Sequence, residues 1–453
     1  MASIAGVYTA LSGLNAHRRV LDVTAHNVAN QATPGFHRQR VDLKAGGLGA
    51  VAAVFAGSGQ QVGGVVADSV TRIVDQLAED RYIRESALQA GTQALSNDMN
   101  RIELSFAEPS DQGIASLLDG FWGGWTDLAT MPGDLATRSQ VLERAQTLVD
   151  GIRVAAADLQ QVATTAQESL VGLAADANDL SSRIAQLNKA ILGNPNAAND
   201  LIDQRGEALR ELAQLTGAVA RPSANGTIDV SIGGRTLVSG DIVQRLNGAG
   251  GVLTWANDAS NVDAGPSRAA SLKNTIEVVV PKYLTNLDTV AATLVTDVNA
   301  LHNAGFAQDG VTTALDFFEP GPPVTAASLA LSVDVVGQPE NIAAAAAGGA
   351  SFDGDLALSM AAVADSVTGA DTEYRTLIGN LGVETREAFR RESIQENVTQ
   401  SARATADSVG GVSVDEEMAN LMSAQRAYEA SARVLTTMDE LLGVLMNTGR
   451  VGR

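Results

Sequence analysis

Cysteine is absent from this chain of 453 residues, and histidine occurs only four times. Without cysteine the chain can form no disulfide, perform no thiol catalysis and hold no metal through sulfur. His17, His26 and His37 lie near the start, but their spacings of nine and eleven residues differ from the close pairs of a metal site. We therefore expect exposed polar histidines, no metal and no other cofactor.

Aromatic residues make up only 4% of the chain, and no apolar run approaches the roughly 18 residues that span a membrane. The first residues lack the basic flank and continuous apolar stretch of a secretory signal. The densest aromatic cluster, 121–125, lies far from any basic patch, so we expect a local core or a subunit contact there rather than base stacking. Composition alone thus predicts a cytosolic protein without membrane insertion.

Catalytic motifs are also missing from the sequence. There is no His-Glu-x-x-His, no Gly-x-Ser-x-Gly and no phosphate-binding loop, since Gly57-Ser58-Gly59 is not followed by Gly-Lys-Ser/Thr. The net charge of −21, from 31 basic and 52 acidic residues, opposes nonspecific binding to nucleic acid and to anionic lipid. The chain is therefore expected to be no enzyme and to bind no nucleic acid.

Helical periodicity dominates what is present. Apolar residues recur at helical spacing over 75–106, 137–192, 199–215, 275–302 and 371–407. The period switches to two only near 226–238, where a Gly-Gly turn joins two strands, and further short strands extend to about residue 272. Residues 306–350 are expected to be irregular. The predicted fold is mainly α with a small β insert.

Both ends of the chain carry apolar stripes whose steps of three and four residues are typical of a coiled-coil seam. Arg18 is the one interruption of the first stripe. Such narrow helices are marginally stable alone and need partners. Opposite net charges at the two ends, +3 over 1–40 and −2 over 410–453, support their pairing, although separate solvated faces explain the charges nearly as well. The stripes are Ile4, Val7, Leu11, Leu14, Leu21, Ala25 and Val28, and Met418, Leu421, Gln425, Tyr428, Ala432, Leu435, Leu442 and Met446.

Local signals mark where the terminal helices end and begin. The first helix should end near Asn30, because Pro34 and Gly35 suit the second and third positions of a type II turn. The last helix should begin with a capping box, in which Ser413 is followed three residues later by Glu416. The acidic residues 415–417 are then explained by the cap and the helix dipole rather than by a cation site.

Segments at both ends resemble the family of flagellar rod, hook and hook-associated proteins. The resemblance lies in 10–14 with 27–36, and in 414–421 with 425–430. The segment Asn199–Arg205, the long helix before it, and 299–305 and 379–383 make the chain most similar to the hook-associated members. Two departures stand out: the chain is shorter than the family suggests, and His37 stands where a small polar residue is common.

This resemblance implies a structural subunit of the bacterial flagellum that joins hook to filament. It implies export by the flagellar type III apparatus through an uncleaved signal, an extracellular location and assembly through terminal helices that form an inner tube. Implied partners are further copies of the chain, the hook protein, the second hook–filament junction protein and an export chaperone (FlgN). The implied domains are 1–40 with 410–453 as terminal coiled-coil helices, 41–217 with about 351–409 as a long-helix bundle, and about 218–350 as an outer domain, β-rich over 218–272.

Residues at both ends are the expected sites. Inter-subunit packing is assigned to Leu11, Leu14, Leu21, Val28 and Asn30, and to Leu421, Tyr428, Leu435 and Leu442, the last four overlapping the chaperone site. Pro34 and Gly35 would serve the turn that leads from the tube helix to the outer domain. An ordinary intramolecular core remains the alternative for each apolar residue.

Other functions stay open. A hook or distal-rod subunit would share the ends but lack the long helix and the 199–205 segment. A secreted enzyme or adhesin domain on an axial scaffold would need its active set within 218–350, and a cytosolic coiled-coil adaptor should be ordered at both ends as a monomer.

Overall fold

The computed structural model describes residues 2–46, 63–194, 198–321, 323–350 and 352–450, without side-chain detail at 2–5, 445 and 447–450. The chain forms two compact units. The terminal unit comprises Met1–Ala87, Ala177–Arg245 and Glu396–Arg453, and the central unit comprises Leu88–Asp176 and Leu246–Gln395. The predicted division into three domains differs from these units and stays a prediction.

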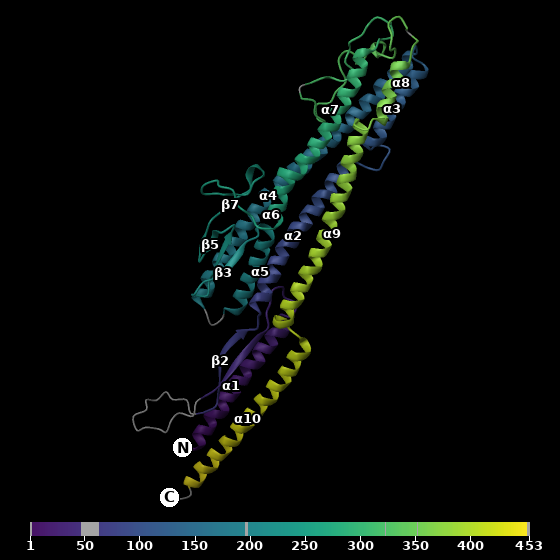
Figure 1. The fold of residues 1–453 in the computed structure, drawn as a ribbon. Coiled ribbons are helices and arrows are strands. Elements are labelled where there is room, and N and C mark those ends of the chain that lie inside the picture. Colours follow the sequence, from purple (N-terminus) through teal and green to yellow (C-terminus); the bar gives the residue numbers. More distant parts are fainter. Residues whose placement is uncertain (1, 47–62, 195–197, 322, 351, 451–453) are drawn as a thin grey trace. The chain divides into compact units, whose positions relative to one another are not determined.

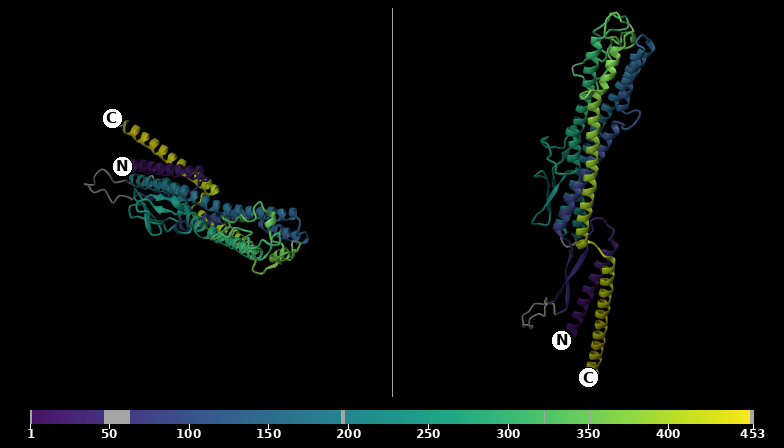
Figure 2. Two further views of the ribbon diagram at one scale, coloured as in Figure 1. Left: turned by 90° about the horizontal axis from the view of Figure 1, so that it is seen from above. Right: turned by 45° about the vertical axis from the view of Figure 1, so that its right-hand side comes forward.

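The terminal unit is built around a pair of long helices, α1 (Ala2–Ala29) and α10 (Val414–Arg450), which lie side by side (Figures 1 and 2). Two antiparallel strands, β1 (Gln39–Ala45) and β2 (Val65–Arg72), also pack on α1. These strands are not evident from the sequence, because the alternation is short and weak: Gln39 and Val41 are the buried residues of β1. Most of the predicted Gly-rich loop between them, including 57–59, lies outside the described residues.

The same unit contains the first part of the predicted β insert, up to Arg245; the later short strands lie in the central unit, and the prediction that strands extend to about residue 272 is wrong, since a helix covers Arg268–Asn274. Helix α5 (Asn199–Thr216) leads into an antiparallel sheet of β3 (Val219–Pro222), β4 (Ile228–Ile232), β5 (Arg235–Ser239) and β6 (Ile242–Val243), in that order. Gly233 and Gly234 join β4 to β5 with φ of 54° and 81°, and positive φ at both positions of a two-residue turn is why glycine is needed there. The predicted strand, Gly-Gly turn and strand are confirmed.

Three further helices contribute residues to both units: α2 (Gln76–Ser105), α4 (Leu135–Gly193) and α9 (Ala370–Gly410). Their bounds agree with the predictions within a few residues. Asp75 explains where α2 begins, because its carboxylate accepts hydrogen bonds from the backbone N–H groups of Leu77 and Ala78 at 3.0 and 3.2 Å.

The central unit encloses an apolar core between helices. Phe121 and Trp125 of α3 (Ile114–Thr130) are fully buried and contact Phe317, which confirms a local core for the aromatic cluster. Its other helices are α6 (Arg268–Asn274), a π-helical segment Thr275–Val279, α7 (Val280–Ala304) and α8 (Asp355–Ala361). Short strands β7 (Leu246–Asn247) and β8 (Thr254–Trp255) and the 3-10 turns Ala249–Gly251, Pro339–Asn341 and Ala362–Asp365 complete it.

Two expectations for this unit are refined. The helical run before His302 begins at Arg268 rather than Thr275. The described residues of 306–350 are irregular, as predicted, apart from isolated bridges and the 3-10 turn Pro339–Asn341. His302, for which the sequence makes no prediction, is 1% exposed: its ring contacts the Leu315 carbonyl and accepts from the Ala343 N–H. The fold is mainly α with a small amount of β structure, as predicted. None of the described helices is long and apolar enough to cross a membrane.

Candidate functional site

Helices α1 and α10 run antiparallel with a constant register. A Cβ added at Gly6 would lie 2.8 Å from Met438 Cε, and one added at Gly13 would lie 3.1 Å from Ser431 Oγ. Further along, Asn27 Nδ2 donates to Glu417 Oε2 at 2.9 Å. The step of seven residues from Gly6 to Gly13 thus matches the step from Met438 back to Ser431, and the step of fourteen from Gly13 to Asn27 matches that from Ser431 back to Glu417. Two antiparallel helices with the same rise per residue give this correspondence.

The seam between the two helices is lined by small residues on α1. Ala10, Gly13, Thr24 and Asn27 are buried, and no side chain at the two glycines keeps the helices apart. On α10 the seam residues alternate in steps of four and three: Glu417 and Ala424 are buried, and Leu421, Tyr428, Ser431, Leu435, Met438 and Leu442 are half-buried. Small residues on one helix and larger ones on the other therefore produce a close contact.

The predicted site residues of α10 lie on this seam, whereas those of α1 do not form its centre. Leu14, Leu21 and Val28 are half-buried at its edge, and Leu11 is 42% exposed. The buried face of α1 is displaced by about one residue from the predicted stripe, because the glycines and alanines, not the leucines, approach α10. The expectation that the two apolar stripes face each other within one chain is wrong for α1. Whether these residues pack between subunits stays a prediction.

Apolar side chains remain exposed on the outer faces of both helices. Tyr8 and Leu11 lie on α1, three residues apart, and the exposed Arg18 follows one heptad after Leu11. On α10 the exposed apolar residues include Met418, Met422, Val434, Leu441, Val444 and Met446. Neither the partner helix nor the hairpin covers these faces.

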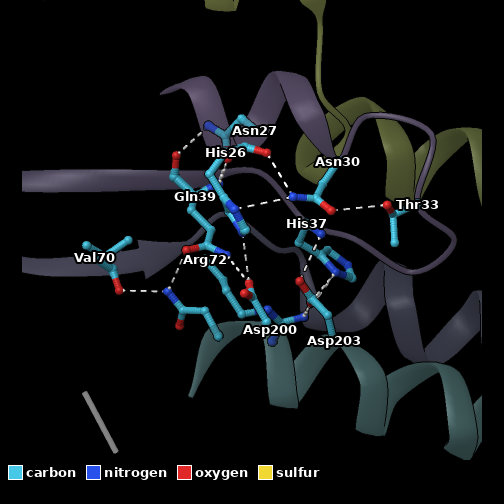
Figure 3. Close-up of polar contacts among 11 residues, drawn as sticks. His26, Asn27, Asn30, Thr33, His37, Gln39, Val70, Arg72, Asp200 and Asp203 are labelled. Carbon is cyan, nitrogen blue, oxygen red and sulfur yellow. Dashed lines mark hydrogen bonds and ion pairs between the residues drawn. The ribbon is translucent and has the colours of Figure 1, made fainter. Parts of the chain in front are cut away.

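A polar network closes the end of α1 (Figure 3). Asn27 is 1% exposed; its Oδ1 accepts from the Gln39 N–H at 2.9 Å, and its Nδ2 donates to the Gln39 carbonyl at 2.8 Å. Gln39 in turn donates from Nε2 to Asp200 Oδ1 at 2.7 Å, and Asn199 donates to Gln39 Oε1 and to the Val70 carbonyl. The first strand of the hairpin is thereby held between α1 and the start of α5.

Asp203 is the second centre of this network (Figure 3). It accepts from the His37 N–H at 3.1 Å, lies 2.8 Å from His37 Nδ1 and forms an ion pair with Arg72 at 2.6 Å. Burial lowers the pKa of His37, but its hydrogen bonds with Asp203 and Glu79 outweigh burial and raise that pKa to about 9. The ring is therefore charged at neutral pH. The prediction of an exposed helical histidine is wrong here, since His37 follows α1 and its side chain is 13% exposed.

The other predicted residues near this point have local roles. Asn30 donates to the His26 carbonyl at 3.0 Å and accepts from Thr33 at 3.2 Å, which closes the end of α1. The Phe36 N–H donates to the Thr33 carbonyl at 3.2 Å, and Gly35, at φ +72°, follows Pro34, the geometry of a type II turn. His17 is half-buried, and His26, 39% exposed at its side chain, lies 3.2 Å from Asp200.

The acidic start of α10 contacts α1 and β1 rather than acting only as a cap. Arg38 Nε lies 2.7 Å from Glu417 Oε1, and Arg38 Nη1 lies 2.9 Å from Glu416 Oε2. Glu417 is 2% exposed, so the interpretation of 415–417 as a cap with a favourable dipole misses its main contacts. A signal was available in the sequence: Glu417 continues the seven-residue seam of Ala424 and Ser431.

A cavity of about 540 Å³ lies beside the 31–37 turn, bounded by α2, α5 and the end of α9. Its charged lining is internally paired, with Glu207 bound to Arg210 and Asp407 lying 3.5 Å from Arg403. Within the part of the chain that the structure describes, no three His, Asp or Glu side chains are grouped so that they could hold a metal ion. In the terminal unit, three segments that are distant in the sequence, 27–36, 199–205 and 414–421, thus lie together and are linked by polar contacts.

Three protein families match consecutive parts of the chain. The flagellar hook-associated protein FlgK helical domain matches residues 99–318. The flagella basal body rod protein family matches 7–37, which is α1 with the following turn, and the C-terminal family of the flagellar basal body rod FlgEFG proteins matches 408–448, which covers α10.

Relatives with the same name match nearly the whole chain. Flagellar hook-associated protein 1 of Bacillus subtilis is 28% identical over 99% of this chain and 98% of its own length, and that of Escherichia coli is 21% identical over 97% and 99%. The structure of the flagellar hook junction protein FlgK from Burkholderia pseudomallei aligns with a TM-score of 0.48 and 21% identity, over 53% of this chain and 47% of that one. The helical-domain match, the rod-type ends and the full-length relatives agree, and the chain belongs to the family of flagellar hook-associated protein 1, FlgK, a structural component of the bacterial flagellum.

Proposed function

We propose that this chain joins the flagellar hook to the filament, and that copies of it assemble through their terminal helices after export by the flagellar type III apparatus. The observation that carries the proposal is the exposed face of the helix pair. Tyr8 and Leu11 of α1 and the exposed apolar residues of α10 lie within the two segments that match rod-type families. Apolar faces of this kind on a structural protein favour contact with further subunits.

Repeated head-to-tail contact would give a tube or ring. The face of α1 differs from that of α10, so a contact between them on neighbouring copies is heterologous and generates a ring or an open helix. Within this proposal Leu11, and with it Leu14, Leu21, Val28 and Asn30, belong to the inter-subunit side of α1. Residues 1–40 with 410–453 would then form the inner-tube domain, and Pro34 and Gly35 would lead out of it.

The hook–filament junction is favoured over a hook or rod position by the middle of the chain. Rod-type families match only the ends, whereas the FlgK helical domain matches 99–318, which includes the whole of α4. The expected neighbours are therefore the hook protein on one side and the second hook–filament junction protein on the other, and the expected location is extracellular.

Chaperone binding would use α10 in a state separated from α1. Leu421, Tyr428, Leu435 and Leu442 are half-buried on the seam, so a chaperone (FlgN) reaches them fully only when α10 is not paired. An exported chain that has not yet folded offers this state. The chaperone would then keep an apolar helix from premature association.

Deletion of 414–453 tests the proposal in the source cell. We expect the shortened protein to be exported, because its amino-terminal segment is intact, and to be lost into the medium without supporting filament attachment. Secretion is measured by immunoblotting of the medium and filaments by electron microscopy, with the full-length chain as the control. Normal filaments on these cells would refute the assignment.

A further inference from the structure

The apolar part of the α1–α10 seam repeats every seven residues and specifies its own register poorly. Gly6 and Gly13 on α1 are alike, and Ala424 and Ser431 on α10 are both small. A shift by one heptad would move α10 by about 10 Å along α1 and would still place small residues opposite small residues. The extra chain length comes from the segment before α10, where the last turn of α9 ends at the paired glycines Gly410 and Gly411 and can unwind while α10 itself stays helical.

One contact occurs only once along the seam. The Glu417 carboxylate is 2% exposed, and its two oxygens are held by different residues: Oε1 by Arg38 Nε at 2.7 Å and Oε2 by Asn27 Nδ2 at 2.9 Å. Asn27 cannot turn its amide freely, because its Oδ1 accepts from the Gln39 N–H and its Nδ2 donates to the Gln39 carbonyl. Asn27, the donor to Glu417 Oε2, is thus fixed to the backbone of β1, and Arg38, the ion-pair partner of Oε1, directly precedes that strand.

We infer that Glu417 is the residue that fixes the register of the antiparallel α1–α10 pair. After a shift by one heptad, Glu417 would lie opposite Val20, which has no donor to offer. A buried carboxylate without a partner is strongly unfavourable, whereas a shifted apolar seam costs little. A single buried polar residue at a seam position is a well-attested means of specifying register, at some cost in stability.

This role differs from that of a residue that merely stabilises the pair. Glu416 also contacts Arg38, but its side chain is 64% exposed, and it lies one position off the seam. If register depends on the buried carboxylate, replacing Glu417 by an apolar residue keeps the helices paired and lets them slide. Replacing Glu416 leaves the register unchanged.

Disulfide crosslinking reads the register directly, because the chain has no cysteine of its own. A Cβ at Gly13 would lie 3.7 Å from Ser431 Cβ, a separation that suits a disulfide, so Gly13→Cys with Ser431→Cys reports the native register. Gly6→Cys with Ser431→Cys reports the shifted one, since the two positions are about 10 Å apart in the native pair and opposite each other after the shift. Both pairs are placed in the full-length chain with Glu417, Glu417→Leu or Glu416→Gln, and oxidised under the same mild conditions. Crosslinks are quantified by mass spectrometry and helix content by circular dichroism.

With Glu417 present, and equally with Glu416→Gln, we expect the native crosslink almost alone. With Glu417→Leu, helix content should persist, and the ratio of shifted to native crosslink should rise by about tenfold or more. An unchanged ratio would overturn the inference, and so would the lack of a native crosslink in the chain with Glu417. Loss of both crosslinks in Glu417→Leu would also overturn it, because Glu417 would then be needed for pairing and not for register.

For assembly, a fixed register matters because it fixes the position of the exposed face of α1 relative to the exposed face of α10. Every copy of the chain then presents the same surface to its neighbours. That consequence rests on the proposed function, whereas the crosslinking result does not. Normal filaments after deletion of 414–453 would refute the junction role and leave the register result unaffected.

Discussion

At the residue scale, Asp203 shows why a polar cluster can be functional in a structural protein. It holds the backbone and ring of His37 and the guanidinium of Arg72, so one carboxylate attaches the segment after α1 and the strand β2 to α5. The segment after α1 and helix α5 contain or adjoin segments that resemble the flagellar family, and Asp203 joins them although more than 160 residues separate them in the sequence. The cluster fixes the positions of the segment after α1, of β2 and of α5 relative to one another.

The raised pKa of His37 gives the terminal unit a stability that depends on pH. Because the folded-state pKa of about 9 exceeds the ordinary histidine value of 6.5, the contribution is complete below about pH 6.5 and is lost as the pH rises through 9. The full effect would be on the order of 3 kcal/mol at most. We expect His37→Gln to reduce the loss of stability between pH 6 and pH 10, measured by urea unfolding of both proteins at each pH. Parallel curves for the two proteins would contradict this assignment.

At the element scale, long helices could be predicted from the sequence and their exact faces could not. The bounds of α4 and α5 follow from periodicity and from stop signals such as Gly193 and Gly217. The buried face of α1, in contrast, depends on which residues allow close approach, and a hydrophobic pattern gives leucine more weight than glycine. The β1–β2 hairpin is not evident from the sequence because only Gln39 and Val41 are buried in its two strands, so the alternation that marks a strand is faint.

The two faces of α1 should therefore respond differently to substitution. Leu11→Asp changes an exposed position, so the unfolding free energy should stay within about 0.5 kcal/mol of the wild-type value while incorporation into filament-bearing flagella falls. Gly13→Leu places a large side chain where a Cβ already meets Ser431 Oγ at 3.1 Å, and should cost about 1–3 kcal/mol.

Thermal or urea unfolding combined with a motility assay separates the two variants. Equal destabilisation by both would mean that Leu11 belongs to the intramolecular seam. A motile Leu11→Asp strain with intact filaments would remove the support for α1 as an inter-subunit surface. Arg18→Leu is a third variant for the same two assays. Because Arg18 is exposed, we expect this substitution to impair assembly and to leave the free energy of unfolding unchanged.

At the scale of the whole molecule, the sequence predicted the family but not how its motifs meet. Each motif was recognisable alone, yet nothing in one segment reveals that Asn27 bonds to Glu417 or that His37 bonds to Asp203, separated by 390 and 166 residues. Such contacts depend on the path of the chain between them. From the sequence alone, a helix cap accounts for the acidic residues 415–417, and exposure to solvent accounts for His37. Neither explanation requires a partner from a distant part of the chain.

The two units should also differ in their resistance to proteolysis. The central unit has an extensive apolar core that includes Phe121, Trp125 and Phe317, whereas α1 and α10 share a narrow seam of mostly small residues. Local opening costs less free energy where fewer apolar contacts are lost. We expect trypsin to cleave the free full-length chain first in the terminal helices, at Arg18 in α1 and at Arg426 in α10.

Arg391 is the matched control, since it is an exposed arginine on a helix of the central unit, with a side chain 62% exposed. If exposure alone decided the rate of cleavage, trypsin would cut at Arg391 and Arg18 equally fast. Because the helix that carries Arg391 packs on the large apolar core and α1 packs only on a narrow seam, we expect cleavage at Arg18 well before cleavage at Arg391. Mass spectrometry of a digestion time course gives the order of cleavage. Ends that resist trypsin as long as Arg391 does would contradict the expectation that the narrow α1–α10 seam opens locally at a lower cost than the core of the central unit.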